Sequence, residues 1–161
     1  MMVVVVMSGA IAFGIVAFVV RDNVSSFPPG YFGNVAALSA DAAQDLADAA
    51  PSEILASCLA GDSAACTDQQ ENATAAADRV AQLADAIGSN TPPFDAVIWH
   101  SAYLDVLGEL RLSLLAQSDA IALDDTEALE RAVALTRSVV DEEAALTDQF
   151  NADFVDRLQA S

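Results

Sequence analysis

Hydrophobic and polar positions divide the chain into an uncharged opening and a longer amphipathic remainder. Residues 1–20 read MMVVVVMSGAIAFGIVAFVV and contain no charged side chain. At about 1.5 Å per residue, a helix of this length measures about 30 Å, the thickness of a bilayer's hydrocarbon core. A cleaved secretory signal would have a basic start, a shorter apolar run and a small-x-small cleavage site, and we find none of these before Phe27. The pattern therefore predicts a single transmembrane anchor at 1–20.

Small side chains mark one side of the predicted anchor. Ala10 and Gly14 are four residues apart, and Ala17 follows three residues later, so all three share one face of a helix. Such a strip lets a second transmembrane helix approach closely, because no large side chain separates the two backbones. Since Gly and Ala are common in membrane helices generally, the strip fits either a packing surface or ordinary composition.

A segment rich in Pro, Gly and aromatic residues follows the anchor. Pro28-Pro29-Gly30 and Gly33 stand between Arg21 and Asn34, where they interrupt a helix. We therefore predict a linker over 21–37 that joins the anchor to a water-facing domain over 38–161.

Beyond the linker, apolar residues recur with the 3.6-residue period of amphipathic helices. Pro51 divides the first stripe into two short helical segments, which together form one arm. A longer helix after Gly61 ends at Gly88, a favoured residue just past a helix C-terminus. Thr91-Pro92 then predicts the start of another helix, with Thr as the N-cap and Pro at the first helical position.

The last helix is predicted to begin at Asp124, because Glu127 three residues later makes an Asp variant of the capping box. Short loops between long helices favour antiparallel neighbours, so the chain predicts an all-α antiparallel bundle of about four helices. The core positions expected in the two last helices are Phe94, Ile98, Tyr103, Leu107, Leu110 and Leu114, followed by Leu135, Val139, Leu146, Phe150, Phe154 and Leu158.

The water-facing part is strongly acidic. Lys and Arg together number 6 against 24 Asp and Glu, which leaves a net charge of −18, and the chain contains no Lys. Nucleic-acid affinity comes mostly from basic groups that displace counterions from phosphates, so nucleic acid is excluded as the expected partner. Anionic lipid headgroups would also repel the domain. Charged partners should therefore present basic protein surfaces.

The two cysteines, Cys58 and Cys66, flank a Gly61-Asp62 turn that brings them within reach of a disulfide. Paired cysteines favour an oxidising compartment, which places the domain on the extracytoplasmic side, periplasmic or extracellular. Arg21 beside the anchor favours the opposite, cytoplasmic location of the domain, because positively charged flanks of membrane helices tend to stay in the cytoplasm.

Residue types suited to catalysis are sparse. His100 is the single histidine, whereas metal sites in helical bundles use several histidines or Glu-x-x-His pairs, so we expect neither a metal nor a cofactor. Glu109, Glu142 and Glu143 fall near the apolar stripes of the last two helices, so one of them is a candidate buried carboxylate. Such a group could act as a general acid or form an ion pair with Arg111 or Arg137, while a solvated helix face is the plainer interpretation.

No Gly-rich phosphate loop, nucleophile elbow or C-x-x-C-H motif occurs, so we expect the chain not to be an enzyme. The pattern instead predicts a membrane-anchored accessory or scaffold subunit, held among other transmembrane subunits of a larger assembly. An extracytoplasmic helical-bundle ligand sensor is an alternative.

A second alternative comes from a resemblance. The apolar run at the start of the chain resembles that of mature pilin-like subunits, whose processed chains begin directly with such a helix. The resemblance covers the first 20 residues, and Val5 stands where bacterial type IV pilins carry a glutamate. It implies a filament subunit that packs through its N-terminal helix.

Overall fold

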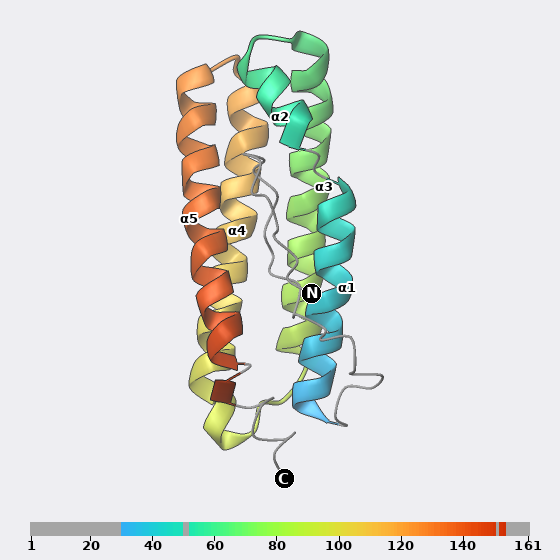
Figure 1. Ribbon diagram of the computed structural model, residues 1–161, viewed down its shortest axis with the longest axis vertical. Helices are drawn as coiled ribbons and strands as arrows, with labels where there is room; N and C mark the ends of the chain where they lie inside the picture. The colour runs from blue at the N-terminus through green and yellow to red at the C-terminus, as the bar shows by residue number, and fades with distance from the viewer. Residues whose placement is uncertain (1–29, 50–51, 151, 154–161) are drawn as a thin grey trace, which may run out of the picture.

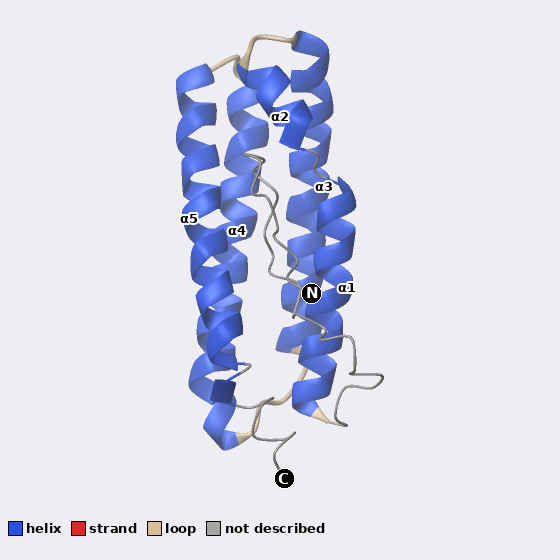
Figure 2. Ribbon diagram, in the orientation of Figure 1, coloured by secondary structure: helices blue, strands red, loops and turns tan. Residues whose placement is uncertain are grey.

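The computed structural model of the chain describes residues 30–49, 52–150 and 152–153, and these confirm the all-helical class. Figure 2 shows helices and short connections, with no strand in the described ranges. The elements are α1 (Tyr31–Ala49), α2 (Ser52–Leu59), α3 (Ser63–Gly88), the 3-10 turn η1 (Phe94–Ala96), α4 (Val97–Ala122) and α5 (Thr126–Phe150).

The helices form a bundle in which successive long helices run in opposite directions (Figure 1). α1 and α2 both pack on α3, α3 packs on α4, and α4 packs on α5, so α1 and α2 make the predicted single arm. We call the end with the start of α1 and the 89–96 connection the proximal end. The distal end holds the turns at 60–62 and 123–125.

The predicted anchor at 1–20, with Ala10, Gly14 and Ala17, lies outside the described residues. Within the described ranges, we find no helix with both the length and the apolar character needed to cross a bilayer.

α1 begins at Tyr31, which corrects the predicted linker boundary at residue 37. Gly30 precedes the helix with a φ of 100°, a left-handed conformation that favours glycine, and this sets the start of the helix. Phe32 packs its ring 5.9 Å from that of Phe150, and Val35 is fully buried. This packing offsets the cost of about 1 kcal/mol for a glycine, here Gly33, inside a helix.

α3 follows its local signals closely. Asp62 caps it, since its Oδ1 accepts hydrogen bonds from the backbone N–H groups of Ala64 at 2.9 Å and Ala65 at 3.2 Å. The helix ends at Gly88, as predicted. Its buried face contains Ala73, Ala76, Ala77, Val80, Leu83 and Ile87, and these mostly small side chains let α1 and α4 approach closely.

α4 begins at Val97, after η1, so the predicted Thr91 cap is wrong. Phe94 and Ile98 were expected in the core but are 98% and 86% exposed. Consecutive helical residues point about 100° apart, so the burial of Trp99 turns Ile98 towards solvent. Trp99 is favoured inside because its ring stacks on that of Tyr103, and its Nε1–H donates to the Leu146 carbonyl at 2.9 Å.

α5 begins at Thr126 and is capped by Asp125, one residue after the predicted Asp124. Asp125 Oδ1 accepts from the Ala128 N–H at 2.9 Å, while Asp124 adopts a φ of 54° in the connection. Leu135, expected in the core, is 51% exposed. The buried face of α5 instead carries Leu129, Ala132, Val133, Thr136, Val139, Glu143, Thr147 and Phe150. Phe154 and Leu158 lie outside the described residues.

Candidate functional site

A buried polar cluster joins α1, α4 and α5 in the proximal half of the bundle. The Tyr103 hydroxyl on α4 donates to Glu143 Oε1 on α5 at 2.9 Å. Thr147, one turn further along α5, donates to the same oxygen at 3.0 Å. Ser39 Oγ on α1 lies 3.3 Å from the Tyr103 hydroxyl, whose single proton goes to the carboxylate, so Ser39 is the donor of that bond. We call these four residues the Glu143 cluster.

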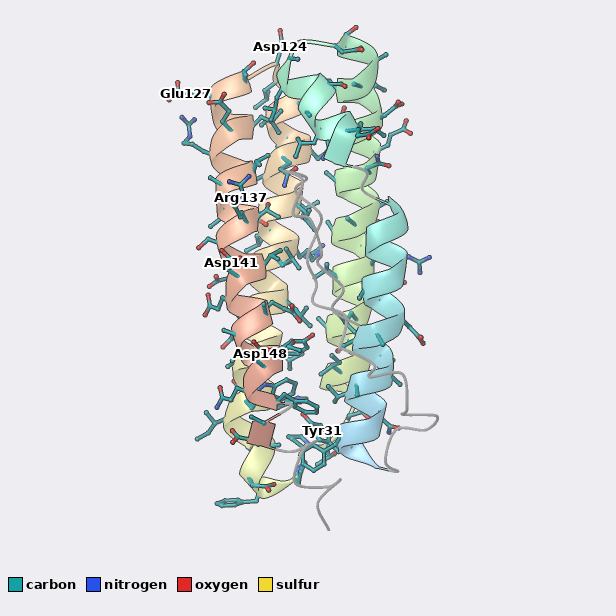
Figure 3. The ribbon with its side chains drawn as sticks, viewed as in Figure 1. Tyr31, Asp124, Glu127, Arg137, Asp141 and Asp148 are labelled. Carbon is teal, nitrogen blue, oxygen red and sulfur yellow. A yellow bond between two sulfur atoms is a disulfide. The ribbon has the colours of Figure 1, made fainter. Side chains whose placement is uncertain are left out.

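Of the three candidate carboxylates, the structure buries Glu143 and exposes the other two. Glu143 is 1% exposed, whereas Glu109 and Glu142 lie on the solvent side of their helices. Arg111 and Arg137 are exposed as well, and Figure 3 shows Arg137 on the outer side of α5. The partners of the Glu143 carboxylate are thus the hydroxyls of Tyr103 and Thr147, and among the described residues the suggested ion pair with Arg111 or Arg137 is not formed.

Burial shifts the acid–base properties of the two tyrosines. The pKa of Tyr103 is raised, first because the buried phenol would lose hydration on ionising and second because the negative charge of Glu143 lies beside it. Burial also raises the pKa of Tyr31 to about 12. Both hydroxyls therefore stay protonated at neutral pH and act as hydrogen-bond donors.

His100 is a hydrogen-bonded residue of the core. It is 9% exposed, and its Nδ1 lies 2.7 Å from the Tyr31 hydroxyl, which links the first turns of α1 and α4. Desolvation lowers the pKa of the imidazole, which favours its neutral form. Neutral Nδ1 can accept the phenol proton. The described part of the chain brings together no group of three or more His, Cys, Asp or Glu side chains able to hold a metal ion.

Aromatic rings surround the Glu143 cluster on its proximal side. The Trp99 and Tyr103 rings stack with centroids 4.8 Å apart, and Phe150 lies 4.4 Å from Trp99. Phe32 continues the layer from α1, 5.9 Å from Phe150. The rings separate the carboxylate from the proximal end of the bundle and hold Tyr103 in position.

A second set of buried polar side chains crosses the distal half of the bundle from α3 to α5. Gln69 Nε2 donates to Gln117 Oε1 at 3.3 Å, and Gln117 Nε2 donates to Thr136 Oγ1 at 2.8 Å. Thr136 Oγ1 also lies 2.9 Å from Ser113 Oγ. These four residues, which we call the Gln117 network, are at most 1% exposed. They satisfy one another inside the bundle, as buried polar groups must to avoid a desolvation penalty.

The apolar stripes predicted Tyr103 in the core and Glu143 as a candidate buried carboxylate, but they predicted neither the hydroxyl partners of Glu143 nor the Gln117 network. A signal was present: Ser113 and Gln117 are four residues apart on α4, as are Glu143 and Thr147 on α5, so each pair shares one helix face. Polar residues with that spacing, in line with an apolar stripe, indicate a hydrogen-bonded layer inside a bundle.

The predicted disulfide between Cys58 and Cys66 is confirmed, with Cα atoms 4.4 Å apart. It ties α2 to the first turn of α3 at the distal end. Beside it lies a pocket of about 380 Å³, lined by the disulfide, by Ser63 and Thr67 of α3 and by residues 120–122 and 124–126, which include Asp124 and Asp125. The Glu143 cluster and His100 lie outside this pocket. The polar groups of its lining include hydroxyls and exposed carboxylates.

These arrangements stabilise and orient helices. Within each buried cluster the side chains hydrogen-bond to one another, so the role that these contacts support is structural. Comparison of the chain with protein-family models, curated proteins and solved structures finds no match.

Proposed function

We propose that the chain is a non-catalytic, membrane-anchored accessory or scaffold subunit of a larger membrane assembly, with its bundle on the extracytoplasmic side. The observation that carries the proposal is the combination of an uncharged stretch at 1–20 with a cross-braced, acidic bundle beyond it. The apolar stretch has the length of a bilayer core, and the bundle offers a fixed surface to neighbours.

The bracing of the bundle supports a mechanical role. The Glu143 cluster joins three helices and the Gln117 network joins α3, α4 and α5. A buried polar contact can form in few arrangements of the helices, because shifting one helix would leave donors and acceptors unsatisfied. A bundle that resists sliding suits a spacer or brace better than a domain that must rearrange.

The proposal of a non-catalytic role rests on the places of the titratable groups in the core. His100 and Glu143, the residues best suited to proton transfer, are both buried and hydrogen-bonded to tyrosine hydroxyls. A general acid or base must come within about 3 Å of a substrate atom, and the distal pocket includes neither residue.

The proposed side of the membrane is supported by the disulfide, since disulfides persist in oxidising compartments. Asp124, Asp125, Glu127 and Glu130 are exposed at the distal end, where Arg131 pairs with Glu127 at 2.6 Å. Such an acidic surface would attract a basic surface of another protein. Neighbouring transmembrane subunits would instead contact the strip of Ala10, Gly14 and Ala17.

The test is gentle detergent extraction of the full chain from its native membrane, followed by size and mass measurement. A defined complex with other membrane proteins is the expected result. Sedimentable fibres would instead support the filament alternative, and a lone monomer or dimer would support the ligand sensor. Both of these outcomes would overturn the accessory-subunit proposal.

A matched pair of variants tests the packing strip. Gly14→Leu places a large side chain on the strip and should dissociate the complex, whereas Gly9→Leu makes the same change about 100° around the helix from Ala10. Equal complex yields for the two variants would show that the strip is not the contact surface.

A further inference from the structure

Three apolar side chains stand exposed together where α4 begins. Phe94 of η1 is 98% exposed, and Val97 and Ile98 of α4 are 47% and 86% exposed. They are spaced i, i+3 and i+4, which brings their side chains to one side of the helical start. Single exposed apolar residues are ordinary, whereas a group of large ones indicates a contact surface. We call these three residues the proximal patch.

The proximal patch lies at the end of the bundle where the chain arrives from the predicted anchor. Figure 3 shows Tyr31 at this end, and the Tyr31 hydroxyl is 2.7 Å from His100 Nδ1, two residues after Ile98. Residues 21–29, nine in number, separate the apolar stretch 1–20 from Gly30. Nine extended residues span at most about 30 Å, so a bilayer holding 1–20 lies within that distance of α1.

The carboxylates are distributed unequally between the two ends. Among the described residues, those within two helical turns of the proximal end are Asp85, Asp95, Asp148 and Asp153. Those within two turns of the distal end are Glu53, Asp62, Asp68, Asp119, Asp124, Asp125, Glu127 and Glu130. Bringing the distal end to lipid phosphates would therefore meet more repulsion than bringing the proximal end. Charge and apolar exposure favour the same orientation.

We propose that the proximal patch inserts into the headgroup region of the bilayer that holds the anchor. This inference rests on the proposed membrane anchorage and adds a second, peripheral lipid contact. Phe94 and Ile98 lie in the lipid interface, and Asp95 between them stays at the level of the headgroups and water. Two attachment points set the tilt of the bundle, so the disulfide end projects away from the membrane.

The experiment measures lipid contact of single labelled positions in the full chain, reconstituted into phosphatidylcholine vesicles. Cys58 and Cys66 are bridged to each other, so one introduced cysteine is the single reactive thiol. Phe94→Cys carries a fluorescent label on the patch, and Ile98→Cys is a second, independent reporter. Leu123→Cys is the matched control, because Leu123 is a 78% exposed apolar residue at the distal end.

Lipids with a quencher near the headgroup should reduce the fluorescence at 94 and 98 at least about twofold more than at 123, since interfacial side chains reach the headgroup boundary. Equal quenching at all three positions would overturn the proposal. Protection of 94 and 98 from water without lipid quenching would identify a protein as the occupant, with the same consequence.

Flotation of the vesicles separates failure of this inference from failure of the proposed function. Chains that float with the vesicles while positions 94 and 98 remain unquenched retain the anchor and lose the patch contact. Chains that do not float lose both. Circular dichroism of each variant checks folding, which should be unaffected because the replaced side chains face solvent.

Discussion

Replacing Tyr103 by Phe removes one hydroxyl from the centre of the Glu143 cluster and leaves the ring in place. Tyr103 is 0% exposed, so no bulk water reaches the groups left behind. Its hydroxyl donates to Glu143 Oε1 at 2.9 Å and accepts from Ser39 at 3.3 Å. The stack of the ring on Trp99 should persist, because it does not involve the hydroxyl.

The cost follows from these two contacts. A hydrogen bond to a charged group contributes about 1.5–3 kcal/mol, and the longer neutral bond to Ser39 adds about 0.5 kcal/mol. Removing the hydroxyl also removes its own desolvation penalty, which offsets part of the loss. We therefore expect Tyr103→Phe to lower the free energy of unfolding by about 2 kcal/mol at pH 7.

Urea unfolding of the full chain in mild detergent measures this change. Circular dichroism follows the helices, and fluorescence of Trp99, the single tryptophan, follows the aromatic layer, since its ring lies 4.8 Å from that of Tyr103. Tyr31→Phe is the matched control, because Tyr31 is the one other tyrosine and its partner His100 is neutral. It should cost about 1 kcal/mol or less.

A double-mutant cycle isolates the contact between Tyr103 and Glu143. If the hydroxyl acts mainly on the carboxylate, Tyr103→Phe should cost about 1.5 kcal/mol less in a Glu143→Leu chain than in the parent. An equal loss in both backgrounds, or a Tyr103→Phe chain as stable as the parent, would refute the assigned role of the cluster.

Three further predictions concern other parts of the bundle. Opening the disulfide by Cys58→Ser with Cys66→Ser should lower the free energy of unfolding by about 2–2.5 kcal/mol, as loop entropy gives for a separation of 8 residues, and alkylation of two thiols in fresh protein would contradict the bridge. Thr136→Val removes the acceptor 2.8 Å from Gln117 Nε2 and should cost about 1–2 kcal/mol in urea unfolding; an unchanged midpoint would argue against the Gln117 network. The contribution of Tyr31 to the free energy of unfolding should be fully present below pH 10 and should be lost as pH rises towards 12. The reason is that the folded state raises the pKa of Tyr31 from 10.0 to about 12, so the folded chain holds the phenol proton more tightly than the unfolded chain. Tyr31→Phe should reduce the loss of stability between pH 10 and 12. If variant and parent lose stability equally over this range, Tyr31 is not the cause.

The sequence alone determined the features that depend on neighbouring residues. The helical period predicted the all-α class, Gly88 marked the end of α3, and the spacing of Cys58 and Cys66 around a turn predicted their bridge. Such signals act within one or two helical turns, so they need no knowledge of what packs against the segment.

Tertiary contacts decided which face of each helix is buried. α1 extends back to Tyr31 because Phe32 packs against Phe150 across the bundle. α4 buries Trp99 instead of Ile98, because the indole packs on the rings of Tyr103 and Phe150 and donates a hydrogen bond to the Leu146 carbonyl. Similarly, three glutamates had comparable local patterns, and the position of Tyr103 on the facing helix shows why Glu143 is the one that is buried, since Tyr103 donates to its Oε1. A stripe of apolar residues fixes the rotation of a helix about its axis to within one residue, or about 100°. Packing and hydrogen-bonding partners far away in the chain decide the rotation within that range.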